Sequence, residues 1–120
     1  MLANYFECRD LLLDALAHGD GRVTEALLVH QLVTGEYQLW RTDNSAGVTQ
    51  INENPFNKCL FIFLAAGDLN EIANVAGPVI EQWAADIGCT SIILSGRLGW
   101  ERAVRPLGYE FQSTNLIKKL

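Results

Sequence analysis

The sequence has few of the residues that mark secreted, metal-binding or membrane-spanning proteins. It has three cysteines, an odd number, with no C-x-x-C pair and no histidine at ligand spacing. These features argue against a disulfide framework and against a zinc site. The longest apolar run, residues 59–66, is far shorter than the ~20 residues of a membrane-spanning helix. The N-terminus also lacks the basic and apolar blocks of a secretory signal, so we expect a cytoplasmic protein that does not bind membranes.

Basic residues are scarce as well. The chain has 9 Lys and Arg against 14 Asp and Glu, which gives a net charge of -5. This balance disfavours nucleic-acid binding, because such binding needs a clustered basic surface that neutralises phosphates. With 120 residues, of which 49% are hydrophobic, the chain can bury one core but not two. We therefore expect a single domain over residues 1–120.

The spacing of apolar residues predicts two helices before the first strand. Apolar residues recur every three or four positions over Tyr5–Ala17, and a glycine-rich segment at 18–21 ends that helix. A second apolar stripe follows Thr24 and ends at Gly35, because glycine readily adopts the left-handed conformation that closes a helix. The two helices are therefore joined by a short turn.

Alternating and continuous apolar segments then predict strands. Residues 36–41 and 46–51 alternate on either side of a turn at 43–45, which is typical of a β-hairpin. A second turn at 52–57 leads into Lys58–Ala65, a continuous apolar run of the kind found in strands that are covered on both faces. We expect this run to be the central strand.

A long helix and a second buried strand follow. The apolar stripe of Leu69–Ile87 predicts the helix, and Pro78 predicts either a kink or a division into two helices. The strand at 90–95 completes a crossover unit, which places it parallel to the central strand. A short helix at 100–105 and an antiparallel strand at 110–118 come last. The predicted fold class is α/β (α+β), a mixed sheet with the element order α-α-β-β-β-α-β-α-β.

This order resembles the GCN5-related N-acetyltransferases. The similarity covers the chain from about Thr24 to its end, and its more specific parts are segments 84–89 (Ala-Ala-Asp-Ile-Gly-Cys) and 107–109 (Leu-Gly-Tyr). The family has one further strand at its N-terminus, and Met1–Asn4 is too short to supply it. The resemblance implies that the central strand and the next strand separate, and that acetyl-coenzyme A inserts into the gap between them.

The family also has a glycine-rich loop at the start of the long helix. Its backbone amides hold the pyrophosphate of the cofactor, because aligned amides and the helix dipole favour an anion. The resemblance places Gly67, Asn70, Glu71, Ile72 and Ala73 at this position. These residues are therefore the candidates for cofactor binding.

Two carboxylates, those of Asp68 and Glu71, would stand where the pyrophosphate lies. Repulsion of this kind costs up to about 1 kcal/mol per pair even in solvent-like surroundings. The spacing of the two residues predicts instead that Asp68 is a helix N-cap and that Glu71 completes a capping box. The segment thus favours helix initiation over phosphate binding.

The resemblance assigns no catalytic residue. The tyrosine that protonates the departing thiolate in many family members is replaced by Val104. Tyr109 matches an aromatic residue that packs beneath the fold, so we expect it in the core. Glu53 is a candidate general base for an amine, although a carboxylate in an Asn-rich turn is usually only solvated. No metal site is expected.

A cluster of glycines and arginines follows the second buried strand. It begins at the carboxyl end of a parallel strand and enters a helix, where open α/β sheets usually bind ligands. Gly96 and Gly99 allow close backbone approach, and Arg97 and Arg102 supply guanidinium groups for a small anion or for a carboxylate of a protein partner. The alternative is structural, with Arg102 paired to an acidic neighbour.

Three functions stay open. The first is a divergent, non-catalytic or vestigial acetyltransferase-like module that acts through protein contacts. Chain size and segment 96–101 also resemble small acetyltransferase-like proteins of tailed phages and prophages, which implies virion assembly or host interaction, in the host cytoplasm or the virion. The second is an N-acyltransferase that uses acetyl-coenzyme A with an atypical loop, and the third is a small-anion binding module. The edge left by the absent strand would favour a homodimer.

Overall fold

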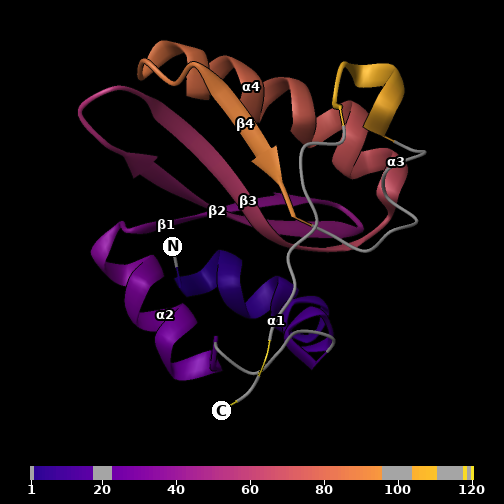
Figure 1. Cartoon of the computed structure of the whole chain (residues 1–120). Coiled ribbons are helices and arrows are strands. Elements are labelled where there is room, and N and C mark those ends of the chain that lie inside the picture. The colour runs from indigo at the N-terminus through magenta and orange to yellow at the C-terminus, as the bar shows by residue number, and fades with distance from the viewer. Residues whose placement is uncertain (1, 18–22, 96–103, 111–117, 119) are drawn as a thin grey trace.

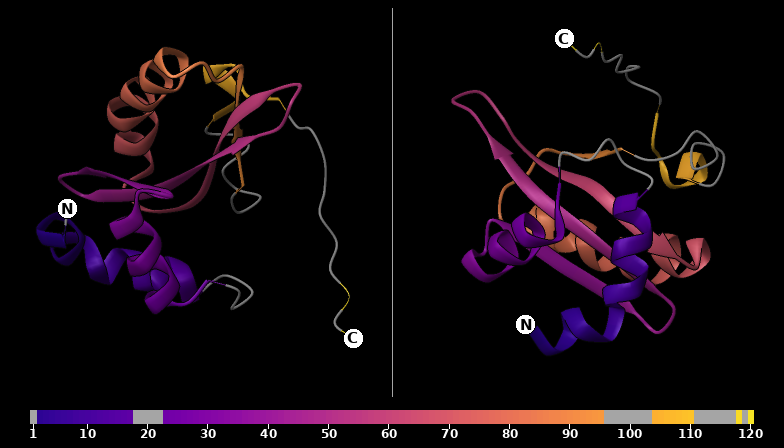
Figure 2. Two further views of the ribbon diagram at one scale, coloured as in Figure 1. Left: turned by 90° about the vertical axis from the view of Figure 1, so that its left-hand side faces the viewer. Right: turned by 90° about the horizontal axis from the view of Figure 1, so that it is seen from below.

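A computed structural model of the protein describes residues 2–17, 23–95, 104–110, 118 and 120. In chain order its elements are α1 (Leu2–Ala17), α2 (Glu25–Thr34), β1 (Tyr37–Thr42), β2 (Ser45–Glu53), β3 (Lys58–Gly67), α3 (Leu69–Glu71), η1 (Ile72–Ala76), α4 (Gly77–Asp86), β4 (Ser91–Leu94) and η2 (Arg105–Leu107). The strands form one sheet in the order β1-β2-β3-β4. Helices α1 and α2 lie on one face of the sheet and α4 lies on the other (Figure 1, Figure 2).

The sheet is mixed, as the sequence predicted. β1 and β3 each pair antiparallel with β2, whereas β4 runs parallel to β3 after the crossover through α4. The two N-terminal helices, the hairpin, the central strand and the crossover all follow the predicted order. The predicted α/β (α+β) fold class is confirmed.

The N-terminal helices begin and end where local chemistry predicts. The hydroxyl of Thr24 caps α2 by accepting a hydrogen bond from a backbone N–H of the first turn at 3.2 Å. Gly35 ends α2 in the left-handed conformation, with φ at 88°. Glu25, in the first turn of α2, binds Tyr5 and Arg9 of α1. The two helices are therefore held together as one layer.

A hydrophobic core lies on each face of the sheet. The core beneath α1 and α2 consists of Tyr5, Cys8, Leu12, Leu28, Leu32, Tyr37, Ala46, Val48 and Leu64. On the other face, Leu60 of β3 packs against Ile80 and Ala84 of α4. Trp40 and Trp83 pack against this second core, and their rings meet edge to face with 5.4 Å between centroids. Both tryptophans are half-buried at this position.

The long helix is divided into three successive elements, and the last of them, α4, begins at Gly77 next to Pro78, as the sequence predicted. In a regular α-helix, Pro78 would lack a donor and its ring would clash with the carbonyl four residues earlier. The helix instead widens into a π-turn over Ile72–Ala76, in which the N–H of Gly77 donates to the carbonyl of Ile72. Elements α3, η1 and α4 thus follow one another without interruption.

Both ends of the chain are described in part. Residues 2–4, which are too few to form the further family strand, belong to α1. Near the other end, η2 is a single 3-10 turn that Gly108 closes with φ at 95°. Of the predicted helix at 100–105, only Val104 and Arg105 are described, and the predicted strand at 110–118 lies outside the described residues except for its two ends. Both elements stay predictions.

Candidate functional site

β3 continues beyond the point where β4 stops pairing with it. The parallel ladder ends where Ile62 faces Leu94. One further hydrogen bond joins the N–H of Ser95 to the carbonyl of Ile62 at 3.0 Å. β3 then runs on to Gly67. Within the described part of the chain, residues 63–67 therefore have no strand beside them on the β4 side.

A β-bulge marks the place where the two strands part. Val48 and Thr49 are consecutive on β2, yet their partners on β3 are Leu64 and Ile62. Phe63 is therefore an extra residue in β3. An extra residue bends its strand and changes which of the following backbone groups face each neighbour.

The register of the hairpin shows which groups of β3 face this gap. Thr42 and Ser45 close a two-residue turn as a hydrogen-bonded pair. Along β2, every second residue after Ser45 directs its N–H and C=O toward β1, so those of Gly47 point toward β1. Ala65 is the partner of Gly47 on β3. The N–H and C=O of Ala65 therefore point away from β2 and into the gap. An extended molecule can pair with such an edge as a further strand would.

Asp68 occupies the start of the long helix. Its carboxylate accepts a hydrogen bond from the N–H of Glu71 at 3.2 Å, which confirms Asp68 as the N-cap. The N–H of Ile72 donates to the carbonyl of Asp68 at 3.1 Å. Two of the amides predicted to hold a pyrophosphate are therefore already bonded to Asp68.

The side chain of Glu71 does not form the predicted capping box. Its carboxylate accepts hydrogen bonds from the backbone N–H of Asn44 at 3.1 Å and from the Asn44 side-chain amide at 2.9 Å. The N–H of Asp68, which a capping box would give to Glu71, donates to the Asn44 carbonyl at 2.9 Å. Hydrogen bonding to Asn44 also holds the pKa of Glu71 below its ordinary value. Glu71 thus ties the helix to the β1–β2 turn.

Gly67 belongs to the same contact. Its φ is 99°, and a Cβ at this position would lie 2.2 Å from the carbonyl oxygen of Asn44. Only glycine lets the turn approach so closely. Asn70 accepts a side-chain hydrogen bond from the next helical turn, and Ala73 is half-buried within the π-turn. The five predicted cofactor residues therefore gather at the helix start, and their binding of pyrophosphate stays a prediction.

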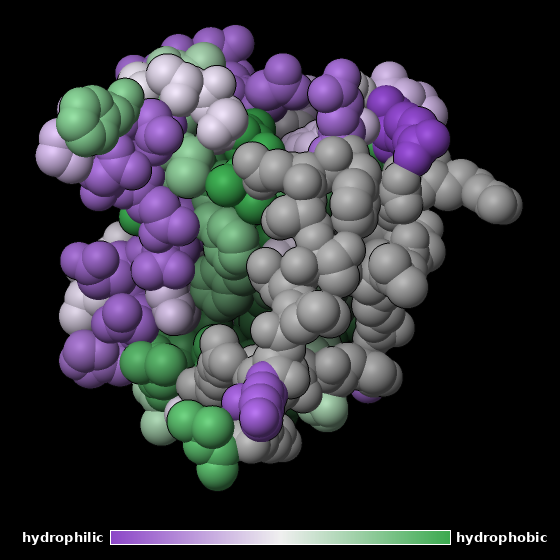
Figure 3. Space-filling view, viewed as in Figure 1, coloured by the Kyte–Doolittle hydropathy of each residue, from purple (hydrophilic) through white to green (hydrophobic). Residues whose placement is uncertain are grey.

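Aromatic side chains line β3 beside the gap. The ring of Phe63 lies 4.7 Å from that of Tyr37 and stacks at 6.2 Å on that of Phe61, measured between centroids. Ile93 of β4 is the register neighbour of Phe61. Phe61, Phe63 and Ile93 are only half-buried. Figure 3 shows hydrophobic side chains gathered in a hollow at the centre of this view. A ligand in the gap would meet an apolar wall.

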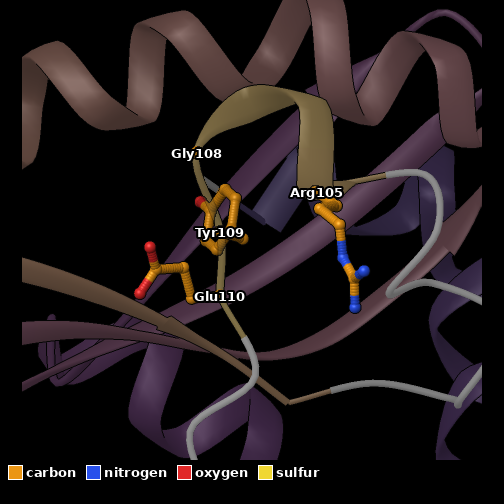
Figure 4. A pocket seen from close by; sticks show the side chains of 4 residues that line it. All are labelled: Arg105, Gly108, Tyr109 and Glu110. Carbon is orange, nitrogen blue, oxygen red and sulfur yellow. The ribbon is translucent and has the colours of Figure 1, made fainter.

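A second hollow, of about 400 Å³, lies beside η2 and is lined by Arg105, Gly108, Tyr109 and Glu110 (Figure 4). Tyr109 is half-buried, and burial, together with the nearby carboxylate of Glu81, raises its pKa. Arg105 and Glu110 bring opposite charges to this hollow. The predicted anion or partner site consists of Gly96, Arg97, Gly99 and Arg102, which lie outside the described residues.

Two further candidate positions, Val104 and Glu53, lie among the described residues. Val104 is 9% exposed, so a buried apolar side chain stands at the position that the resemblance assigns to the proton donor. Glu53 is exposed at the end of β2. Among the described residues, no group of His, Cys, Asp and Glu side chains is arranged to hold a metal ion. The helices in the same part of the chain include none that is long and apolar enough to cross a membrane.

Solved structures with the same arrangement include several acetyltransferases. An aminoglycoside acetyltransferase from an uncultured soil metagenomic sample matches 99% of this chain and 90% of its own, with a TM-score of 0.67 and 11% identity. The chain has an acetyltransferase fold. An acetyltransferase from Trypanosoma brucei matches 90% of this chain and 89% of its own, with a TM-score of 0.60 and 12% identity. Glucosamine-6-phosphate N-acetyltransferase from Arabidopsis thaliana matches 88% of this chain and 86% of its own, with a TM-score of 0.59 and 13% identity. No family model matches the sequence, and no curated protein is significantly similar to it.

Sequence reasoning missed two features of this acetyltransferase fold. The bulge at Phe63 leaves no signal, because the residues on both sides of it are apolar and only the register with β2 reveals the extra one. The bond between Asn44 and Glu71 joins residues that are 27 positions apart. Both features depend on partners that are distant in the sequence.

Proposed function

We propose that this protein binds an acyl-coenzyme A in the gap between β3 and β4 and transfers the acyl group to an amine. The free edge of β3 beyond Ile62 carries this proposal, because Ala65 directs a backbone donor and acceptor into the gap. The pantetheine arm of coenzyme A contains amides, which can pair with such an edge as an extended peptide does. The acetyltransferases that share the fold support the same class of reaction.

In this reaction the amine nitrogen attacks the thioester carbonyl, the carbon–sulfur bond breaks and coenzyme A leaves as the thiolate. The amine loses one proton, which reaches the thiolate through solvent, since Val104 has none to give. The described residues contribute orientation through the edge of β3. Phe61 and Phe63 supply an apolar wall that limits access of water to the thioester.

The pyrophosphate half of the molecule fits the helix start less well than the pantetheine arm fits β3. The carboxylate of Asp68 already accepts the hydrogen bond that an anion would use, and its charge would repel a phosphate group. We therefore attribute most of the affinity to the pantetheine arm. The helix start then serves mainly to anchor the β1–β2 turn through Glu71.

A calorimetric comparison of acetyl-coenzyme A with acetyl-pantetheine, which lacks the pyrophosphate, tests this assignment. Both should bind the wild-type protein. Ala65→Pro removes the N–H that faces the gap without removing a bond to β2, and should weaken both ligands about tenfold. A thermal melt of this variant checks that the fold is intact. Failure of acetyl-coenzyme A to bind at millimolar concentration would overturn the proposal.

Substitution of Asp68 separates the two halves of the ligand. Asp68→Ala frees the N–H of Glu71 and removes one carboxylate, so acetyl-coenzyme A should bind more tightly while acetyl-pantetheine is unaffected. Asp43→Ala is the matched control, because it removes an exposed carboxylate from the nearby β1–β2 turn and leaves the helix cap in place. Equal effects of both variants on acetyl-coenzyme A would assign the gain to net charge alone.

A second candidate function is that of a non-catalytic module that acts through protein contacts. The occupied helix cap at Asp68 and the apolar side chain of Val104 favour it. The resemblance to phage and prophage proteins extends this candidate to virion assembly or host interaction, in the host cytoplasm or the virion. Absence of acetyl-coenzyme A binding, with the fold intact, would favour this second function.

A further inference from the structure

Within the part of the chain that the structure describes, the sheet edge at β1 carries few of the usual protections against pairing. Among the described residues, β1 is the terminal strand. Its sequence, Tyr-Gln-Leu-Trp-Arg-Thr, contains neither proline nor lysine, and its pairing with β2 has no bulge. The one charged side chain, that of Arg41, forms an ion pair with Glu7 of α1. Because proteins normally protect exposed edges with such devices, an unprotected edge is a site where another strand can pair.

The hairpin register identifies the backbone groups that this edge offers. Thr42 and Ser45 form the hydrogen-bonded pair that closes the turn. Counted back from Thr42, every second residue of β1 bonds to β2, and the residues between them point outward. The outward N–H and C=O groups belong to Tyr37, Leu39 and Arg41.

We propose that β1 of a second copy of this chain pairs with this edge, antiparallel and centred on Leu39. Leu39 then faces the partner's Leu39, and Tyr37 faces the partner's Arg41. All outward residues of both strands form hydrogen-bonded pairs, which gives about six main-chain bonds. If the pairing were instead centred on Gln38 or on Trp40, one outward-facing residue of each β1 strand would have no partner in the other β1 strand. No like charges oppose each other, so the edge is complementary to itself under a twofold axis.

The helix layer favours the same partner. Among the strands, α2 contacts chiefly β1, whereas α1 contacts chiefly β3 and β2. Leu27 follows Glu25 by two positions, about 200° around the helix, and so lies on the flank of α2 opposite the one that binds α1. The side chain of Leu27 is 39% exposed. A twofold axis at Leu39 places both α2 helices on the same face of the joined sheet, each with its Leu27 flank toward the axis.

Charge substitutions at Leu39 test both the partner and the register. Analytical ultracentrifugation should give the mass of two chains for the wild type. Leu39→Lys and Leu39→Glu should each give the mass of one chain, because each places two like charges opposite each other across the axis. A mixture of the two variants should recover the mass of two chains, since opposite charges then meet. Val79→Lys is the control, because it adds the same charge at a 58% exposed position on α4 and should leave the dimer intact.

Amide hydrogen exchange gives a readout that does not depend on a variant. The N–H groups of Leu39 and Arg41 should exchange more slowly as the protein concentration rises, while that of the exposed Phe56 should not change. The proposal is overturned if the wild type has the mass of one chain up to about millimolar concentration, or if a dimer forms that neither Leu39 variant affects. Binding of acetyl-coenzyme A does not enter either readout, so this result is independent of the proposed function.

Discussion

The hydroxyl of Tyr5 donates a hydrogen bond to the carboxylate of Glu25 over 2.6 Å and thereby joins α1 to α2. Arg9 binds the same carboxylate through two nitrogen atoms, at 2.5 and 3.1 Å. These bonds, that of Arg9 foremost, lower the pKa of Glu25 to about 2. Burial, followed by the bond to Glu25, raises the pKa of Tyr5 to about 12. Two helices are thus held together by groups that titrate outside their ordinary ranges.

Glu25→Gln should lower the stability of the protein at neutral pH. Because the pKa of Glu25 falls from 4.5 to about 2 on folding, its contribution is present above pH 4.5 and is lost as the pH falls toward 2. The difference in urea midpoint between wild type and variant should therefore shrink over this range. Glu36→Gln, an exposed carboxylate before β1, is the control. A difference that stays constant from pH 6 to pH 2.5 would contradict the assignment.

Tyr5→Phe should cost about 1 kcal/mol at neutral pH, because it removes one hydrogen bond from a side chain that is 1% exposed. A pKa raised from 10.0 to about 12 means that the contribution is present below pH 10.0 and is lost as the pH rises through about 12. Denaturation series at pH 8 and pH 11.5 measure this loss. Tyr37→Phe, which removes a hydroxyl from the same core without touching Glu25, is the control.

Gly67→Ala should destabilise the protein more than Gly35→Ala. Both glycines have positive φ, so each substitution costs about 1–2 kcal/mol in backbone strain. At Gly35 nothing lies within 4 Å of the added methyl group, whereas at Gly67 the Asn44 carbonyl oxygen lies at 2.2 Å. We expect at least about 1 kcal/mol of additional loss at Gly67. Equal losses in chemical denaturation would show that the β1–β2 turn yields without cost.

Thr49→Val should destabilise the protein by about 1–3 kcal/mol, although it conserves shape. The Thr49 hydroxyl is buried, accepts a hydrogen bond from the Trp40 indole at 2.9 Å and donates one to the Gln38 amide oxygen at 2.9 Å. Valine has no hydroxyl, so the Trp40 indole and the Gln38 amide oxygen each lose a hydrogen bond. Urea denaturation followed by tryptophan fluorescence measures the loss. Thr34→Val, at an exposed position on α2, should change stability far less.

The sequence predicted those parts of the fold that depend on neighbouring residues. Thr24 and Gly35 mark the two ends of α2, and both could be predicted because capping uses backbone groups within one turn. The crossover from β3 to β4 could be predicted because its handedness and direction follow from general rules for strand connections. Apolar periodicity was sufficient to place α1, the hairpin and the central strand.

The parts of the site that could not be predicted depend on distant partners. Glu71 had a plausible neighbour in Asp68, yet it binds Asn44 because the hairpin brings that turn to the helix start. The gap beside β3 depends on the register at Phe63, which the apolar sequence of β3 leaves undetermined. Pro78 correctly signalled an irregular helix, but the choice of a π-turn depends on how the two flanks pack.

The π-turn has a consequence for how the length of this chain can vary. The helix is fixed at its start by the bond between Glu71 and Asn44, and near its end by a bond from Lys58 Nζ to the Ile87 carbonyl at 2.7 Å. A π-turn holds one residue more than an α-turn. One residue can therefore be deleted within Ile72–Ala76 by exchanging the π-turn for an α-turn, while both anchors keep their places. In related sequences, this is where a missing residue would be absorbed.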